Sequence, residues 1–177
     1  MGIEHCGQVN ILILGDKGVG KSTICSEYAG EELSSVQEKE KGDIPIKTNV
    51  FLGDGKKECI KEYDVHITTS NGIFRRETVQ EYKQKILRSD GYVLIYSIDN
   101  RASYIKLINL LGDIQRTTKD NVPIVIFRNK IDIKVCLPFD EQNLLSQDIP
   151  QFNVSGRTNE GVQKGFKTLV QLCVNKL

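Results

Sequence analysis

The chain has 177 residues, of which 39% are hydrophobic and 27% are charged, and its formal net charge is +1. This length can bury a core without disulfides or metals, and the composition is that of a folded globular protein rather than a disordered one. A net charge so close to zero argues against binding nucleic acid by bulk electrostatics, so no nucleic-acid partner is expected.

The first half of the chain opens with an apolar run at 9–14, which predicts a buried strand. A glycine-rich stretch at 15–22 follows, and then a helix start. Residues 31–43 read as a polar loop whose charges lie on a solvated surface. Two β-rich segments, 44–52 and 58–69, flank a Gly-Asp-Gly turn and predict a β-hairpin. Residues 75–89 are expected to form the next helix.

In the second half of the chain, predicted strands alternate with predicted helices. Residues 92–98 and 122–127 again read as buried strands, and 103–116 between them as a helix, with Ile105, Ile108, Leu111 and Gly112 at helical spacing. Residues 162–177 predict a closing amphipathic helix with one apolar face made of Val162, Phe166, Leu169, Val170 and Cys173. This alternation predicts an α/β domain over 1–177: a mostly parallel sheet with one antiparallel edge strand and helices on both faces.

Neither a membrane span nor a metal-binding cysteine pattern is recognisable. No apolar run is long enough to cross a bilayer, and no signal peptide precedes the first predicted strand. Cys6 stands where a myristoylation motif needs Ser or Thr, and Cys173 lies one position too early for prenylation. Five widely spaced cysteines and two histidines argue against a zinc site and predict free thiols. We therefore expect a cytoplasmic protein without a membrane anchor in this chain.

Residues 15–22, Gly-Asp-Lys-Gly-Val-Gly-Lys-Ser, match the phosphate-binding P-loop motif. Its glycines let backbone N–H groups converge on phosphates, and the helix after it points its positive end at them. Lys21 is expected to reach the β- and γ-phosphates, and the Ser22 hydroxyl to bind Mg²⁺. The strand before and the helix after disfavour an ordinary glycine turn. The predicted phosphate-binding residues are Asp16, Lys17, Gly18, Val19, Gly20, Lys21, Ser22 and Thr23.

A second motif, Asn129-Lys130-Ile131-Asp132, directly follows the strand at 122–127. This is the carboxyl end of a strand, where open α/β sheets bind ligands. The Asp132 carboxylate offers two acceptors that match the ring N–H and the exocyclic amine of guanine, whereas adenine would leave buried groups unpaired. The motif therefore predicts GTP or GDP as the ligand and disfavours a P-loop kinase or ATPase.

With these motifs the sequence resembles the Ras superfamily of small GTPases, most closely the Rab group, over essentially the whole chain. The resemblance implies a P-loop small G domain with a six-stranded sheet, and GTP or GDP with Mg²⁺ as ligands. The 96–100 segment also resembles the Rab passage from strand to helix, and Val154-Ser155-Gly156-Arg157 resembles the Ser-Ala-Lys loop of the family. The implied guanine-binding residues are Asn129, Lys130, Asp132, Ser155, Gly156 and Arg157. Among them Asn129 and Asp132 contact the base, Lys130 braces the loop, and Ser155 and Gly156 close over the guanine.

Both switch segments of the family pattern are damaged. In the first, the Thr that binds Mg²⁺ and the γ-phosphate is replaced by Glu40 or Lys41, and no Thr lies between 24 and 47. Ser34 or Ser35 could substitute only along an unusual loop path. In the second, normally Asp-x-x-Gly-Gln, the best alignment places Thr69 at the Asp and Ile73 at the catalytic Gln. Other alignments, with Asp64 or Ile67 at the Asp position, lack the required glycine. No catalytic residue is therefore assigned.

Two functions remain open. One is an atypical Rab-like GTPase that binds GTP and GDP, hydrolyses GTP very slowly and acts with protein effectors in vesicle traffic. The other is a nucleotide-stabilised interaction module without useful catalysis. Rab proteins generally continue into a lipidated tail, whereas this chain stops at its last predicted helix. That implies either one domain of a longer protein, such as half of a tandem GTPase, or recruitment to a membrane through a partner.

Overall fold

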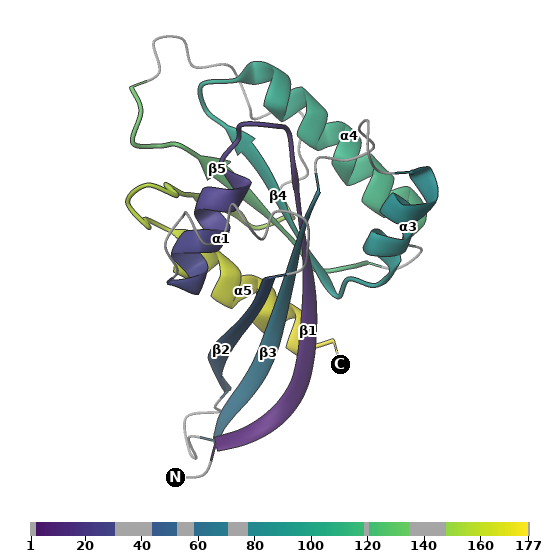
Figure 1. Ribbon diagram of the computed structural model, residues 1–177, viewed down its shortest axis with the longest axis vertical. Coiled ribbons are helices and arrows are strands. Elements are labelled where there is room, and N and C mark those ends of the chain that lie inside the picture. Colours follow the sequence, from purple (N-terminus) through teal and green to yellow (C-terminus); the bar gives the residue numbers. More distant parts are fainter. Residues whose placement is uncertain are drawn as a thin grey trace.

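The computed structural model describes residues 3–30, 44–52, 59–70, 78–118, 121–134 and 148–176. Six strands in this part of the chain form one sheet in the order β2-β3-β1-β4-β5-β6 (Figure 1). Five of them run parallel, and β2 pairs antiparallel to β3 at the edge, so the predicted sheet is confirmed. The strands are β1 (Ile3–Gly15), β2 (Ile44–Leu52), β3 (Cys59–Ser70), β4 (Gly91–Ser97), β5 (Ile124–Asn129) and β6 (Gln151–Asn153).

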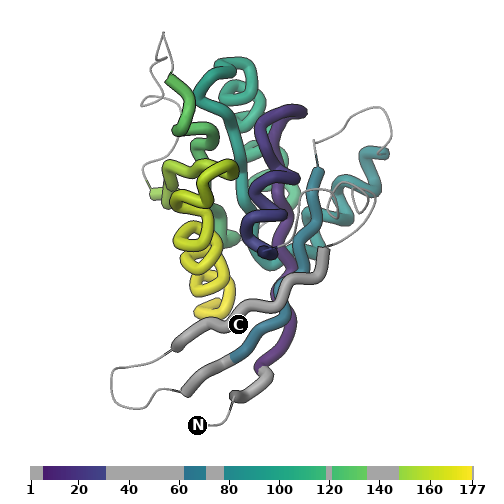
Figure 2. The backbone as a smooth tube through the Cα atoms, turned by 60° about the vertical axis from the view of Figure 1, so that its left-hand side comes forward, coloured from purple at the N-terminus to yellow at the C-terminus, as the bar shows by residue number. Residues whose placement is uncertain are grey.

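Helices cover both faces of this sheet. On one face lie α1 (Lys21–Ala29) and α5 (Val162–Val174), and on the other α3 (Val79–Leu87) and α4 (Arg101–Thr117) (Figures 1 and 2). Tyr28 of α1 stacks on Phe166 of α5 with ring centroids 4.0 Å apart, which joins the two helices of the first face. In the described part of the chain, no helix combines the length and the apolar character that a membrane crossing requires.

The centre of β1 lies between the two helical layers, and this position explains its apolar sequence. Ile11 and Ile13 belong to the core under α1 and α5, whereas Leu12 and Leu14 belong to the core under α3 and α4. Successive strand residues point to opposite faces, so a strand covered on both sides needs apolar residues at every position. β4 follows the same rule, because all seven of its residues are buried.

Several element boundaries differ from those predicted. β1 begins six residues earlier than the apolar run, at Ile3, because β3 pairs with it from Ile3 to Leu14, with a register shift between His5 and Gly7. β5 begins two residues later than predicted because Pro123 has no N–H to donate to the ladder. The three-residue strand β6 was not predicted individually. The hairpin strands agree with the prediction, while its turn and the polar loop at 31–43 lie outside the described residues.

The helical predictions hold for α5 and need one correction in α4. All five residues of the predicted α5 face are buried. In α4, Ile105 of the predicted set is 51% exposed, whereas Leu111 is buried together with Tyr104, Leu107 and Ile114. Apolar residues stand side by side in the α4 sequence, as at 104–105 and 107–108. Helical spacing alone therefore fits either of two neighbouring faces, and packing decides which one is buried. Within the described residues, the helix expected at 75–89 is α3.

Candidate nucleotide-binding site

The P-loop joins the end of β1 to the start of α1, at the carboxyl end of the sheet (Figure 1). Gly18 and Gly20 have φ values of 80° and 97°, in the left-handed region that favours glycine. A Cβ on Gly20 would also overlap the Asn129 amide nitrogen. Gly20 is the N-cap of α1 and has no side chain to cap the first-turn amides. Chain direction and glycine spacing therefore form a cradle of backbone donors at a helix N-terminus.

Lys21 and Asp16 extend this cradle with charged groups. The Lys21 Nζ donates to the carbonyl oxygens of Gly15 and Asp16, at 2.9 and 2.7 Å, so its side chain lies across the loop. The Asp16 carboxylate accepts from the Lys17 N–H at 2.8 Å and forms an ion pair with Lys106 of α4 at 3.5 Å. This ion pair ties the P-loop to the helix that follows β4. The Lys17 side chain is exposed.

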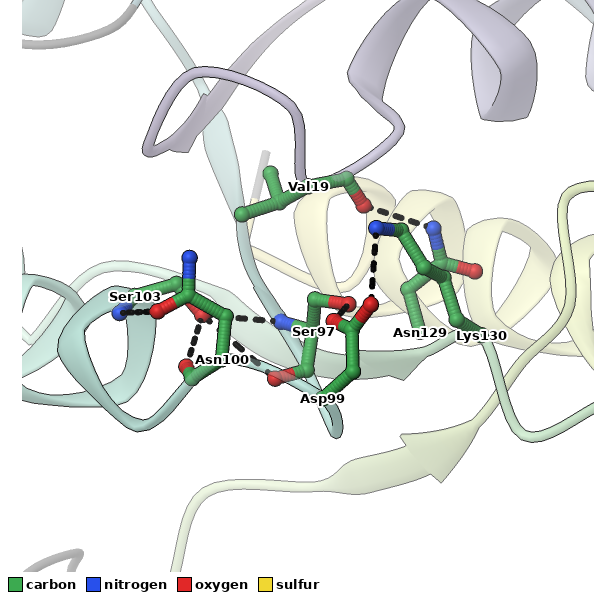
Figure 3. Close-up of polar contacts among 7 residues, drawn as sticks. All are labelled: Val19, Ser97, Asp99, Asn100, Ser103, Asn129 and Lys130. Carbon is green, nitrogen blue, oxygen red and sulfur yellow. Dashed lines mark hydrogen bonds and ion pairs between the residues drawn. The ribbon is translucent and has the colours of Figure 1, made fainter. Parts of the chain in front are cut away.

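Asn129, the last residue of β5, joins two loops. Its Nδ2 donates to the Val19 carbonyl oxygen at 2.7 Å (Figure 3), and its Oδ1 accepts from the Gly156 N–H at 3.1 Å. Asn129 is only 2% exposed, so losing either bond would leave a buried polar group unpaired. The side chain expected to contact a base thus also holds the P-loop against the loop at 155–157.

Ser155 holds Asp132 in place. The buried Ser155 Oγ donates to Asp132 Oδ1 at 2.7 Å and accepts from the N–H groups of Arg157 and Thr158, at 3.3 and 3.2 Å. Asp132 itself is exposed at the rim of the site. Its carboxylate is oriented through one oxygen, which suits a group that accepts hydrogen bonds from a flat, donor-bearing ring. The Arg157 side chain is exposed, and the hydrogen bond to Ser155 comes from the Arg157 backbone N–H.

Gly156 packs tightly against α1. A Cβ at this position would lie 3.1 Å from Ile24 Cγ1 and 3.2 Å from Thr23 Cγ2. The alanine of the Ser-Ala-Lys loop that this stretch resembles would therefore crowd the first turn of α1. Behind that turn, burial raises the pKa of the Cys25 thiol to about 12, although the nearby Lys21 charge acts in the opposite direction. Cys25 is fully buried and belongs to the core under α1 and α5.

Comparison with known proteins identifies the family. The family model described as "Ras family" matches residues 10–175. The chain belongs to the Ras family. Two similar proteins come from Dictyostelium discoideum: Ras-related protein RabZ, 28% identical over 160 residues (88% of this chain, 67% of the relative), and Ras-related protein RabF1, 26% identical over 181 residues (100% and 90%). Human Ras-related protein Rab-27B is 24% identical over 180 residues (96% and 81%). The Rab-like character inferred from the motifs is thus confirmed.

Ras-family proteins typically bind GTP or GDP with Mg²⁺, and the residues of this chain fit such ligands. Gly18 and Gly20 let the loop adopt its left-handed turn, and Lys21 supplies a cation beside the backbone donors of the loop. Ser22, in the first turn of α1, would supply a hydroxyl oxygen to the metal, a ligand type that Mg²⁺ prefers. The motifs at 15–22, 129–132 and 154–157 therefore converge on one end of this Ras-family fold.

Only part of the expected switch region can be placed. Thr69 pairs with Ile13 and Ser70 with Leu14, so β3 ends beside the start of the P-loop. Thr69 is partly buried and Ser70 is buried. Glu40, Lys41 and Ile73 lie outside the described residues, and the switch alignments remain predictions.

Two polar contacts of the site were not predicted from the sequence. One is the Lys106–Asp16 ion pair, and the other joins Lys130 Nζ to Asp99 Oδ2 at 3.3 Å. The second could have been found from topology, because β4 and β5 are parallel neighbours and Ser97 pairs with Asn129. Residues that leave these two strands therefore start side by side.

Proposed function

We propose that this Rab-like member of the Ras family binds GTP and GDP with Mg²⁺ and hydrolyses GTP very slowly. The observation that carries the proposal is the Asn129 side chain, which links the P-loop to the 155–157 loop beside Asp132. That link supports one nucleotide site, in which the P-loop binds the phosphates and the Asp132 carboxylate contacts the base. Guanine presents two donors to a carboxylate, and adenine presents none in the same position, so Asp132 favours guanine.

In the proposed complex each group has a defined role. The backbone N–H groups at 16–23 and the Lys21 ammonium bind the phosphates, while Ser22 holds the metal. Asp132, oriented by Ser155, accepts hydrogen bonds from the base, and Lys130 and Arg157 flank that contact. When bound, Mg²⁺ neutralises charge on the phosphate oxygens. The chain's own residues thus bind and orient the nucleotide.

Slow hydrolysis follows from the residues aligned with the second switch. Phosphoryl transfer in this family depends on positioning and charge stabilisation, and the aligned Ile73 has no polar group with which to orient a water. Thr69, aligned with the Asp that orders the metal's waters, carries no charge. Losing a positioned group costs about a hundredfold or more in rate. A multiple-turnover phosphate-release assay should therefore show a rate far below that of an ordinary small GTPase, and an ordinary rate without a helper protein would contradict the proposal.

Asp132→Asn tests the base reader directly. An amide donates where the carboxylate accepted, so it mismatches guanine but matches xanthine, which has a carbonyl in place of the amine. GDP affinity should fall on the order of a hundredfold, while affinity for xanthosine diphosphate should rise. Competition binding with both nucleotides measures this exchange. Equal losses for both bases would mean that Asp132 acts only structurally.

The cellular role proposed is that of a small GTPase working with protein effectors in vesicle traffic, cytoplasmic or brought to membranes by a partner. The alternative, a nucleotide-stabilised module without switching, draws on the same aligned Thr69 and Ile73. Hydrogen exchange of residues 24–48 and 69–89, with GDP and with a GTP analogue, separates the two. Different protection in the two states supports a switch, and equal protection supports the module.

A further inference from the structure

Asp99 and Lys130 leave two neighbouring strands at the edge of the base-binding loop (Figure 3). Ser97 of β4 pairs with Asn129 of β5, and the Ile98 N–H donates to the Asn129 carbonyl oxygen at 3.1 Å. This pairing brings the next residues into reach, and Lys130 Nζ lies 3.3 Å from Asp99 Oδ2. The contact therefore joins the start of the 130–132 turn to the start of α4.

On the Asp99 side of this contact, hydrogen bonds from nearby residues restrain the carboxylate and its turn. The buried Ser97 hydroxyl donates to Asp99 Oδ1, and this bond, more than the nearby Lys130 charge, keeps the pKa of the carboxyl below its ordinary value. Asn100 then caps α4 by accepting from the Ser103 N–H at 3.2 Å, and Ser103 Oγ accepts from the Ser97 N–H at 3.0 Å. Hydrogen bonds thus join the turn that carries Asp99 to both β4 and α4, and the Ser97 hydroxyl orients the Asp99 carboxylate.

Lys130 occupies a backbone conformation that needs support. Its φ is 67°, in the left-handed region that few non-glycine residues adopt. Two residues later, Asp132 meets Ser155. A residue with this φ changes the direction of the chain between Asn129 and Asp132. The ion pair between Lys130 and Asp99 therefore restrains the turn that positions Asp132.

We propose that Asp99 is a positioning residue of the guanine site, which acts through Lys130 to hold the 130–132 turn and so slows nucleotide release. This inference rests on the proposed guanine-nucleotide binding. Asp99 acts as a charge on Lys130 and makes no contact with the nucleotide itself. Its influence therefore depends on Lys130 being present, and that dependence can be measured.

The test is a double-mutant cycle on release of a fluorescent GDP analogue, mant-GDP, chased with excess GDP in the presence of Mg²⁺. Asp99→Asn should speed release about two- to fivefold, as expected for losing a partly exposed ion pair. Lys130→Gln should speed release as well, and adding Asp99→Asn to it should change nothing further. Asp113→Asn is the matched control, because it removes the carboxylate partner of Arg116 elsewhere on α4. That control should release at the wild-type rate.

Each other outcome has a distinct meaning. Release unchanged in Asp99→Asn, or an Asp99→Asn effect that persists in the Lys130→Gln background, overturns the positioning role. Wild-type protein that fails to bind mant-GDP at all overturns the proposed function before any variant is compared. The unfolding midpoint of each GDP-loaded variant shows whether it folds. If Asp99→Asn does not fold, Ser97→Ala replaces it in the cycle, since it removes only the hydroxyl that holds Asp99, and the same vanishing effect is required.

Discussion

At the scale of single residues, the site depends on close approaches between groups far apart in the sequence. Gly20 is the clearest case, because it combines a φ of 97° with a position where a Cβ would overlap the Asn129 amide nitrogen. That amide is buried and bonded to the Val19 carbonyl oxygen. A side chain at Gly20 would therefore strain the backbone and also displace the link between the two loops.

Gly20→Ala and Gly30→Ala separate these two effects. Gly30 also has a positive φ, 66°, but no atom lies within 4 Å of where its Cβ would stand. Gly30→Ala should cost about 1 kcal/mol of unfolding free energy, from backbone strain alone. Gly20→Ala should cost about 2 kcal/mol more, because a buried hydrogen bond is also lost, and GDP affinity should fall with it. Urea unfolding of both variants measures the difference, and equal costs would contradict the clash.

The titration of Asp99 provides a second prediction at this scale. Its pKa is lowered from 3.8, first by the Ser97 hydroxyl and then by the Lys130 charge. A lowered folded-state pKa means that the group stabilises the fold above its ordinary value, and that this stability is lost as pH falls through the folded value. Carboxyl NMR should place the Asp99 midpoint below 3.8, and Ser97→Ala should raise it. An unchanged midpoint in Ser97→Ala would show that the hydroxyl is not the main cause.

At the scale of elements, α1 and α5 each bury a thiol against the sheet. Cys25 is fully buried and Cys173 is 2% exposed, and burial is the main reason that the pKa of each is raised to about 12. At pH 8 only roughly one in ten thousand such thiols is ionised, and the thiolate is the reactive form. Iodoacetamide should therefore modify the partly exposed Cys6 in the folded protein and spare the other two until denaturant is added. Rapid labelling of Cys25 in the folded state, read by mass spectrometry, would contradict this packing.

How far each element could be predicted depends on how much its sequence restricts its placement. β4 and the centre of β1 are apolar on both faces, so their burial could be predicted from the sequence alone. The buried face of α4 could not be predicted in this way, because Ile105 and Leu107 each fit an apolar helical stripe. Only the packing of the folded protein shows that Leu107 is the buried one. The motif residues of the candidate site were predicted from their spacing. The bonds from Asn129 to Val19 and Gly156, and from Lys130 to Asp99, depend on strand order and loop approach, which a linear pattern does not encode.

At the scale of the whole molecule, one sheet brings the motifs together. The P-loop follows β1, the 129–132 motif begins at the last residue of β5 and the 154–157 loop follows β6, and all three strands run parallel. Parallel strands end on the same edge, so the motifs from both halves of the chain come together at one candidate site. A ligand that binds this edge only in the folded state would stabilise the entire domain.

Guanine-nucleotide selectivity is the central claim, and a competition between two nucleotides tests it most directly. The protein is equilibrated with equimolar GTP and ATP in the presence of Mg²⁺, desalted and denatured, and the released nucleotide is identified by chromatography. We expect guanine nucleotide alone, most of it still GTP because hydrolysis is slow. Adenine nucleotide in a comparable amount, or protein that carries no nucleotide, would contradict the account.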